Sequence, residues 1–246
     1  MIDQEEIQYL SGLQPVAEAL RNRRRSLYRL YLSRRKGSGN LAHMAERSGI
    51  PVSASDIGRI GRLAGTKKHQ GVLLECGPLP TFGLEEILRF EPPGGRDVLL
   101  LLAGVEDPRN LGAVARCCSF FGVRALLLPS RGSAPLSPAA SRASAGALES
   151  LPVAVVGGAP DACRSLEQAG YDVTGIERGG ENLGGWLPQE GKIVLVFGSE
   201  DRGLPPKVRG TCGRIVTIEG AGPTGSLNLS VAAGIALHHL FRHSAP

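Results

Sequence analysis

Three short polar segments follow apolar runs and carry side chains that could bind or orient a ligand: residues 107–116, 198–204 and 226–232. The first offers the amide of Asn110 and the cation of Arg116, and the second places the carboxylate of Glu200 between glycines. The third offers the hydroxyl of Ser226 and the amide of Asn228. Because parallel α/β sheets bind ligands beyond the carboxyl ends of their strands, groups that directly follow a strand face any site there. These five residues are therefore the first candidates for a functional site.

Each segment also has an ordinary structural interpretation. Asp107 or Asn110 can cap a helix on which Arg116 is a surface residue, and Ser226 and Asn228 can cap another. The glycines around Glu200 are equally typical of a plain strand-to-helix turn. One segment alone therefore does not identify a site.

Two further patterns have the spacing of known ligand sites, but the sequence around them does not support such sites. Residues 220–225 match G-x-G-x-x-G, but only 21 residues follow. That is too few for the rest of a dinucleotide-binding unit, so a nucleotide-dependent oxidoreductase is not expected. His239 and His243 lie four residues apart. No third ligand accompanies them, so no metal site is predicted.

Basic residues gather at one end of the chain. The net charge is +5, and residues 1–77 hold 13 Lys and Arg against 7 Asp and Glu, while the remainder holds 15 against 16. One acid-free run with two interleaved tyrosines contains Arg21, Arg23, Arg24, Arg25, Arg29, Arg34, Arg35 and Lys36. Cations that bind phosphates and rings that stack on bases make this run typical of RNA binding, with a solvated basic face as the alternative. We expect four more residues to extend the surface: Lys67, Lys68, His69 and Gln70.

Two structural regions must position these groups. From residue 96 onward, apolar runs alternate with helical patterns, which predicts a parallel α/β sheet covered on both faces. The expected strands are Val98–Ala103, Ala125–Pro129, Val153–Val156, Tyr171–Gly175, Ile193–Phe197 and Arg214–Ile218. The expected helices are Leu111–Phe121, Pro138–Leu148, Asp161–Ala169 and Leu227–Phe241.

Residues 1–77 predict a separate, small α/β domain, joined to the domain at 96–246 by a Pro/Gly-bounded linker at 78–95. The linker contains one short amphipathic piece, Leu84–Phe90. In the small domain we expect helices at Leu13–Arg23, Leu41–Gly49 and Ser55–Leu63, and strands at Leu27–Leu32 and Gly71–Cys76.

The composition favours a globular protein of the cytoplasm. Hydrophobic residues make up 42% of the chain, which does not fit a disordered protein. The longest apolar run, Val98–Val105, is too short to span a membrane. The five cysteines are scattered and odd in number, and no leader-like segment is visible, so we expect a reduced cytoplasmic setting.

Taken together and in this order, the three polar segments resemble the motifs of the SpoU branch of the SPOUT RNA methyltransferases. The matching patterns are D-P-x-N-x-G-x-x-x-R at Asp107–Arg116, F-G-S-E-x-x-G-L at Phe197–Leu204 and S-L-N-x-S-V-A at Ser226–Ala232. The H-Q-G-V at residues 69–72 is similar to a signature of the family's RNA-binding domain, whose fold is like that of a small ribosomal protein. The chain is most similar to the RlmB type, which methylates a guanosine ribose of large-subunit (23S) rRNA. It departs from the family at Glu219 and Gly220, where Pro-Met is usual, and at Asp201, where many members carry glycine.

The resemblance implies a parallel-sheet SPOUT domain with a deep trefoil knot, whose loops surround S-adenosylmethionine. The cofactor contacts that it implies are Thr174, Gly175, Gly198, Ser199, Gly203, Ile218 and Leu227. It also implies RNA as the partner and a homodimer with the last helix in the interface, without a metal or a membrane.

The implied reaction is attack of a ribose 2′-hydroxyl on the methyl group. Arg116 is the family's proposed base, but an arginine side chain keeps its proton at neutral pH. We expect Arg116 instead to bind the adjoining phosphate and lower the pKa of the hydroxyl, while Glu200, Ser226 or Asn228 orients the reacting atoms. The substrate would be rRNA, with tRNA as an alternative. A catalytically silent RNA-binding or ribosome-assembly factor is the alternative of a different class.

Overall fold

The computed structural model describes residues 6–33, 39–90, 96–186 and 191–242. The chain divides into two compact units, and each is described by itself. The first comprises Met1–Pro80 with Pro135–Ser150, and the second comprises Thr81–Ala134 with Leu151–Pro246. The sequence predicted boundaries at residues 77 and 96 and gave no sign that residues 135–150 group with the first unit.

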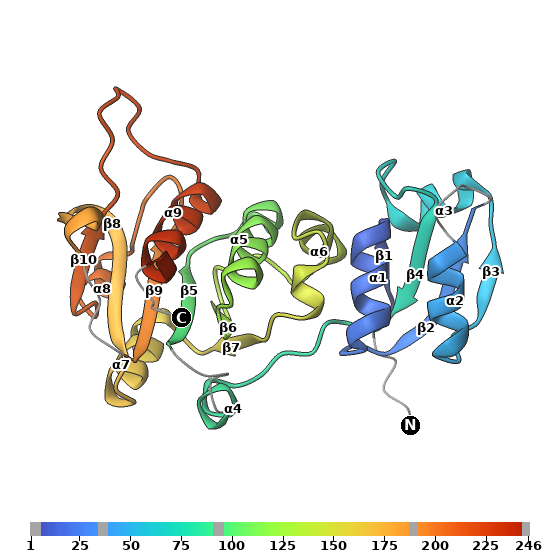
Figure 1. Ribbon diagram of the computed structural model, residues 1–246, viewed down its shortest axis with the longest axis horizontal. Helices are drawn as coiled ribbons and strands as arrows, with labels where there is room; N and C mark the ends of the chain where they lie inside the picture. Colours follow the sequence, from blue (N-terminus) through green and yellow to red (C-terminus); the bar gives the residue numbers. More distant parts are fainter. Residues whose placement is uncertain (1–5, 34–38, 91–95, 187–190, 243–246) are drawn as a thin grey trace. The chain divides into compact units, whose positions relative to one another are not determined.

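The first unit is built on a four-stranded sheet in the order β1-β4-β2-β3 (Figure 1). Its strands are β1 (Gln8–Ser11), β2 (Leu27–Leu32), β3 (Val52–Ala54) and β4 (Val72–Cys76). Strand β4 runs antiparallel to β1 and β2, whereas β2 and β3 are parallel. One face packs on helices α1 (Leu13–Asn22) and α2 (Gly39–Arg47), and alternate strand residues such as Leu30, Val72 and Leu74 form this core.

Helix α3 (Ile57–Ala64) contacts β1 and β4. It begins where the sequence placed a cap, because the carboxylate of Asp56 accepts the N–H of Arg59 at 2.8 Å. It ends at Gly65, whose φ of 60° is left-handed.

Residues 135–150 complete the first unit with helix α6 (Pro138–Ala143) and the 3₁₀ turn η1 (Ala147–Glu149). The sequence predicted one helix over Pro138–Leu148, but the chain turns at Ala145 and Gly146, which have φ values of 52° and 90°. A Cβ added to Gly146 would lie 3.0 Å from the Cα of Pro15 in α1. The turn therefore lets this segment pack closely against α1.

The second unit contains a six-stranded sheet in the order β10-β8-β9-β5-β6-β7, and every neighbouring pair is parallel. The strands are β5 (Asp97–Ala103), β6 (Ala125–Pro129), β7 (Val153–Val156), β8 (Asp172–Asn182), β9 (Lys192–Gly198) and β10 (Arg214–Thr217). The predicted parallel sheet is confirmed. Strand β8 is longer than predicted, because after a register shift between Ile215 and Val216 it continues to pair with β10.

Helices cover both faces of this sheet (Figure 1). On one face, α5 (Pro108–Phe121) and α9 (Leu229–Arg242) pack against each other. On the other, α4 (Leu84–Arg89), α7 (Ala159–Gln168) and α8 (Pro206–Arg209) share one buried core with β5, β6 and β9. A short 3₁₀ turn, η2 (Leu183–Gly185), follows β8. Because β5, β8, β9 and β10 run in one direction, the segments that follow β5, β9 and β10 leave the sheet at the same edge.

Candidate functional site

Side chains from all three motif segments meet at this edge of the sheet, around the carboxylate of Glu200. The Nδ2 of Asn110 donates to Oε2 of Glu200 at 2.6 Å, and the Nδ2 of Asn228 donates to Oε1 at 2.7 Å. The backbone N–H of Leu229 donates to the same Oε1 at 3.2 Å. Three N–H groups from two helices therefore fix the orientation of one exposed carboxylate.

The two helices that supply these donors begin at capped residues. The carboxylate of Asp107 accepts the backbone N–H of Arg109 at 2.8 Å and pairs with its side chain, and these hydrogen bonds hold the pKa of Asp107 below its usual range. Of the two caps that the sequence offered for α5, the structure uses Asp107. Asn110 is thus left inside the first turn, where its amide reaches Glu200.

Asn228 acts both as a cap and as a partner of Glu200. Its Oδ1 accepts the backbone N–H of Ser230 at 3.0 Å and the Ser230 hydroxyl at 2.6 Å, while its Nδ2 binds Glu200. The sequence analysis missed Ser230, whose position in the first turn of α9 was the available signal. Close packing of α5 on α9 supports this arrangement, since the thiol of Cys117 donates to the carbonyl of Ser230 at 3.6 Å.

Arg116 is exposed on α5, about 9 Å along the helix axis from Asn110 at 1.5 Å per residue. It forms no hydrogen bond or ion pair with any residue in the described part of the chain. Its guanidinium is therefore available for an anion.

The predicted cofactor residues in the sheet are tightly packed. Thr174 is fully buried and its hydroxyl donates to the carboxylate of Asp172 at 3.1 Å. A Cβ added to Gly175 would lie 2.7 Å from Ile215 and 2.8 Å from Leu204. Both residues belong to the interior of the sheet, where protein atoms surround the Thr174 side chain and fill the space beside Gly175.

The glycines of the segment after β9 are explained by how this segment folds on itself. Ser199 and Gly203 exchange two backbone hydrogen bonds, of 3.1 and 2.9 Å. A Cβ added to Gly198 would lie 2.0 Å from the carbonyl of Gly203, and one added to Gly203 would meet Glu177 at 2.2 Å. Backbone atoms therefore exclude any side chain at Gly198, and at Gly203 the left-handed φ of 65° favours glycine.

Glu177 is a residue that the sequence analysis missed. It accepts the backbone N–H of Leu204 at 3.1 Å and pairs with Arg209, so it supports the segment that carries Glu200. A single carboxylate two residues beyond the predicted strand Tyr171–Gly175 gave no signal for this role.

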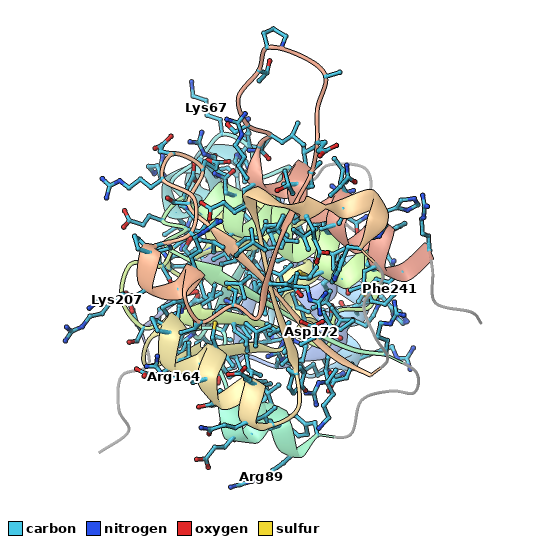
Figure 2. All side chains as sticks on the ribbon, turned by 90° about the vertical axis from the view of Figure 1, so that its left-hand side faces the viewer. Lys67, Arg89, Arg164, Asp172, Lys207 and Phe241 are labelled. Atoms are coloured by element: carbon cyan, nitrogen blue, oxygen red, sulfur yellow. The ribbon has the colours of Figure 1, made fainter. Side chains whose placement is uncertain are left out.

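Residues 218–228 extend away from the sheet as an open loop between β10 and α9 (Figures 1 and 2). Ile218 at its start is half-buried, and Leu227 near its end is 46% exposed. Ser226 forms no hydrogen bond with any residue that the structure describes. Ser226 and Arg116 are therefore the two predicted catalytic residues that form no hydrogen bond with the group around Glu200 among the described residues.

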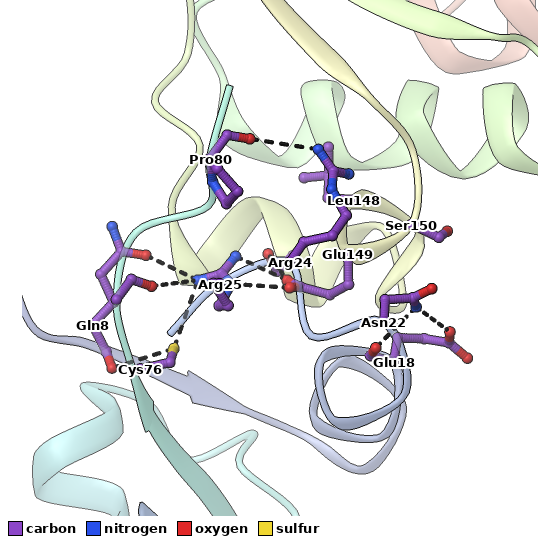
Figure 3. A network of polar contacts seen from close by, with 12 residues as sticks. Gln8, Glu18, Asn22, Arg24, Arg25, Cys76, Pro80, Leu148, Glu149 and Ser150 are labelled. Atoms are coloured by element: carbon purple, nitrogen blue, oxygen red, sulfur yellow. Dashed lines mark hydrogen bonds and ion pairs between the residues drawn. The ribbon is translucent and has the colours of Figure 1, made fainter. Parts of the chain in front are cut away.

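One residue of the predicted basic surface, Arg25, is buried inside the first unit. Arg25 is 4% exposed, and its guanidinium forms two hydrogen bonds of 2.9 Å with the carboxylate of Glu149 (Figure 3). Gln8 and the carbonyl of Gly77 also accept from Arg25, at 3.2 Å each. Arg25 is therefore a buried structural residue and does not lie on an RNA-facing surface.

The neighbours of Arg25 remain at or near the surface. Arg23 is exposed and binds the hydroxyl of Ser48 at 2.7 Å, while partial burial of Arg24 lowers the pKa of its guanidinium. Arg34, Arg35 and Lys36 of the same run lie outside the described residues.

The second predicted basic group, residues 67–70, also contains both exposed and buried residues. Lys67 and Lys68 are exposed, and Lys67 points into solvent (Figure 2). The Oε1 of Gln70 accepts the N–H of Leu13 at the start of α1, at 2.9 Å. His69 is 5% exposed. Gln70 of the H-Q-G-V segment thus has a structural role, because it accepts a hydrogen bond from a backbone N–H at the start of α1 that has no partner within the helix.

Among the residues that the structure describes, no group of three or more His, Cys, Asp or Glu side chains could hold a metal ion. Over those residues, no helix has the length and apolar character needed to cross a membrane.

Comparison with known proteins supports this description of both units. Residues 97–238 match the SpoU rRNA Methylase family, and residues 9–82 match a domain described as RNA 2′-O ribose methyltransferase substrate binding. A curated protein of Mycobacterium ulcerans, described as an uncharacterized tRNA/rRNA methyltransferase, is 36% identical over 198 residues. That match covers 80% of this chain but 64% of the relative, so the chain spans less than two thirds of it.

Two solved structures share the fold. An AdoMet-bound rRNA methyltransferase from Sinorhizobium meliloti superposes with a TM-score of 0.82 and 24% identity, over 99% of this chain and 90% of the other. A putative RNA methyltransferase of the TrmH family from Porphyromonas gingivalis superposes with a TM-score of 0.75 and 26% identity, over 98% and 92%. With the family's motifs gathered around Glu200 and more than half of the sequence matched, this chain belongs to the SpoU rRNA methylase family.

Proposed function

We propose that this chain is an S-adenosylmethionine-dependent RNA 2′-O-ribose methyltransferase of the cytoplasm, acting on a guanosine of 23S rRNA. One observation carries the proposal: three separate sequence motifs place Asn110 and Asn228 on the carboxylate of Glu200. The match of residues 9–82 to a 2′-O-ribose methyltransferase substrate-binding domain supports the ribose and the RNA.

S-adenosylmethionine fits the sheet edge beside this group. A Cβ added to Gly220 or Gly222 would meet no atom within 4 Å, so a ligand can approach the loop backbone closely. Leu227 offers an exposed apolar side chain for an adenine. Ile218 directly follows β10 and Gly198 ends β9, two strands that both pair with β8. The S. meliloti structure is described as bound to AdoMet. When bound, this cofactor supplies a methyl group on a positively charged sulfur, which an oxygen nucleophile can accept.

Arg116 binds the phosphate next to the target ribose in this proposal. A ribose hydroxyl is a weak nucleophile at neutral pH, so a fixed positive charge that stabilises the developing oxyanion increases its reactivity. The guanidinium cannot act as the base because it stays protonated. Its two parallel N–H groups instead bind a phosphate in one orientation.

Glu200 positions the hydroxyl. Its carboxylate retains unused lone pairs, because each oxygen can accept two hydrogen bonds and the described donors are three. A 2′-hydroxyl that donates to Glu200 has its oxygen lone pair directed away from the carboxylate. Asn110 and Asn228 keep the carboxylate from rotating.

An Arg116→Lys variant tests the role of the guanidinium. Lysine keeps the charge but cannot form the bidentate contact, so we expect turnover with saturating RNA to fall about 10- to 100-fold while S-adenosylmethionine affinity stays unchanged. Arg164→Lys, an exposed position on α7, is the matched control. A variant with normal RNA affinity and nearly full turnover would contradict this role.

The RNA substrate is tested by mapping 2′-O-methyl marks on total RNA from a strain that lacks the gene. We expect one guanosine mark in 23S rRNA to be lost. Loss of a tRNA mark instead would favour the tRNA activity that the name of the M. ulcerans relative includes. If no mark is lost and purified protein does not bind S-adenosylmethionine, the chain is a silent RNA-binding factor and the proposed activity is wrong.

We also propose a homodimer through the second unit, with α9 in the interface. Three apolar side chains on the packed pair α5 and α9 are exposed: Phe120 at 82%, Val231 at 48% and Ile235 at 38%. Exposed apolar side chains that gather on one pair of helices mark a surface that another protein covers.

A further inference from the structure

A hollow of about 640 Å³ lies on the first unit, on α3 and the turn that follows it. Its lining includes Ile57, Gly58, Gly61, Arg62, Lys67 and His69. This volume is in the range of sites that bind small ligands, roughly 300–1,000 Å³. The hollow belongs to the first unit and is separate from the group around Glu200.

Glycines form the floor of this hollow. Gly58 and Gly61 are three residues apart in α3 and thus lie on one face of the helix. A Cβ added to Gly61 would lie 3.4 Å from Nε2 of His69, so a side chain here would cover the imidazole. A Cβ added to Gly58 would lie 3.1 Å from Oδ1 of Asp56, so a flat ring can approach the helix backbone at Gly61 rather than at Gly58.

His69 directs a hydrogen-bond donor into the hollow. His69 is 5% exposed, and its Nδ1 accepts the backbone N–H of Gly71 at 3.1 Å. That bond assigns the proton of the neutral ring to Nε2. No residue in the described part of the chain accepts from Nε2. Nε2 is not one of the fully buried polar atoms that lack a partner, and His69 lines the hollow, so a ligand that enters the hollow can accept from this N–H.

The remaining lining residues match the other parts of a nucleotide. Arg62 and Lys67 are exposed cations, and none of the residues that line the hollow is acidic. The side chain of Ile57 is 53% exposed at the rim and offers an apolar surface beside the floor. Cations for phosphate, an apolar and backbone surface for the face of a base, and one donor for its edge are the features with which proteins bind unpaired RNA.

We propose that this hollow binds one unpaired nucleotide of the RNA substrate. The His69 Nε2–H donates to an acceptor on the base edge, the base lies on the glycine floor, and Arg62 and Lys67 bind the flanking phosphates. The proposal rests on the proposed function in taking RNA as the ligand. It adds a base-contacting subsite on the first unit, outside the basic run of residues 21–36.

Two variants of the full chain test the floor and the phosphate contact. Gly61→Ala covers Nε2 while favouring the helix, and Gly39→Ala is its control, since a Cβ there meets nothing within 4 Å. Arg62→Gln removes one cation of the hollow, and Arg47→Gln removes an exposed cation at the end of α2. The probe is a fluorescein-labelled, eight-nucleotide single-stranded RNA of mixed sequence, with a duplex of the same length for comparison.

We expect Gly61→Ala and Arg62→Gln to weaken binding of the single strand about tenfold, and neither control to do so. Arg62→Gln should also reduce the slope of log Kd against log salt by about 0.7, the loss of one phosphate contact. In protein with ¹⁵N-labelled histidine, single-stranded RNA should shift the ring signals of His69, which the variant His69→Gln identifies, and the duplex should not.

The subsite is refuted if both variants bind the single strand with the wild-type affinity and salt slope, or if the duplex shifts His69 equally. Methylation of total RNA by the wild-type protein is measured in parallel. Wild-type methylation with unaffected variants refutes the subsite alone. If the wild-type protein methylates no RNA, the proposed function fails, and the His69 shift still decides the subsite.

Discussion

The proposed role of Glu200 requires a fixed orientation of its carboxylate, and neighbouring residues supply the hydrogen bonds that fix it. Its carboxylate is exposed, and an unrestrained glutamate at the surface samples several rotamers. The amides of Asn110 and Asn228 and the N–H of Leu229 hold both oxygens. Replacing one of these donors with an acceptor should therefore affect the reaction more than it affects folding.

Asn110→Asp is the sharpest such change, because it keeps the shape of the side chain and places a carboxylate 2.6 Å from Oε2 of Glu200. Two carboxylates at that distance cannot both be ionised. We expect kcat at pH 8 to fall about 100-fold and to recover partly as the pH is lowered toward 6 and the pair takes up a proton. The measurement is a pH–rate profile at saturating RNA and cofactor.

Asn22→Asp provides the control, since Asn22 donates to Glu18 at 3.2 Å in the first unit. It creates the same carboxylate pair away from the site and should leave kcat unchanged. An Asn110→Asp enzyme with wild-type kcat at every pH would show that the orientation of Glu200 is unimportant.

At this scale the sequence predicted side-chain types better than side-chain roles. It identified Asn110, Glu200 and Asn228, because the three motifs that contain them, taken together and in order, resemble those of the SpoU family. It also placed Arg25 among RNA-binding cations, because a run of arginines does not reveal which member turns inward to meet a carboxylate 124 residues later. Glu177 was missed for the same reason, since its partners Leu204 and Arg209 are distant in the sequence.

At the scale of elements, the loop between β10 and α9 is more exposed than the other segments of the candidate site. Residues 219–228 are all exposed, and the loop contains a single glutamate, Glu219. If this loop holds S-adenosylmethionine, ligand binding should restrict its access to a protease.

We expect a glutamate-specific protease to cut after Glu219 in the free protein and to cut at least about tenfold more slowly with saturating S-adenosylhomocysteine. Mass spectrometry of the fragments measures the rate, and Glu219→Gln identifies the cut. Leu227→Ala should weaken the protection. Equal cleavage with and without the ligand would contradict a role of this loop in cofactor binding.

The segment 135–150 shows how an element can be held by one buried ion pair. Burial raises the pKa of Glu149, and the guanidinium of Arg25 opposes that rise. Ser141 donates a further hydrogen bond to Glu149 at 2.9 Å. A buried guanidinium that loses its carboxylate is left without charge compensation, so Glu149 should matter far more than a glutamate at the surface.

We expect Glu149→Gln to destabilise the first unit by about 3–5 kcal/mol, whereas Glu85→Gln, which removes an exposed pair with Arg89, changes stability by less than about 1 kcal/mol. The single tryptophan, Trp186, lies in the second unit. In Glu149→Gln, the urea midpoint monitored by hydrogen exchange of peptides from residues 6–33 should therefore fall. The midpoint monitored by tryptophan fluorescence should stay unchanged. If peptides 6–33 of Glu149→Gln unfolded at the wild-type urea concentration, the buried pair would not stabilise the first unit.

Most elements were predictable because their hydrophobic periods are long enough to read. Five strands of the second unit and helices α5, α7 and α9 lie within a few residues of their predicted ranges, whereas β8 extends beyond its predicted end at Gly175 to Asn182. Strands β1 and β3 and helix α8 were not predicted. They contain four, three and four residues, too few for a period to emerge.

At the scale of the whole molecule, the proposed dimer gives the clearest test. We expect static light scattering at micromolar concentration to give twice the chain mass of 25.8 kDa. Val231→Asp should shift it to the monomer, because a charge in an apolar interface is strongly unfavourable. Val155→Asp is the control on β7, where the side chain is 40% exposed. A wild-type monomer would refute the dimer, and the knotted threading implied by the family resemblance stays a prediction.

The first unit is built from two separate stretches of the chain, and this has a consequence for how such proteins arise. Residues 135–150 interrupt the sheet of the second unit in sequence and supply the only carboxylate that binds Arg25 among the described residues. A gene fusion that added residues 1–80 as a single cassette would leave that arginine unmatched inside the new domain. Removal of residues 1–80 alone would likewise leave Glu149, between β6 and β7, without the guanidinium that compensates its charge.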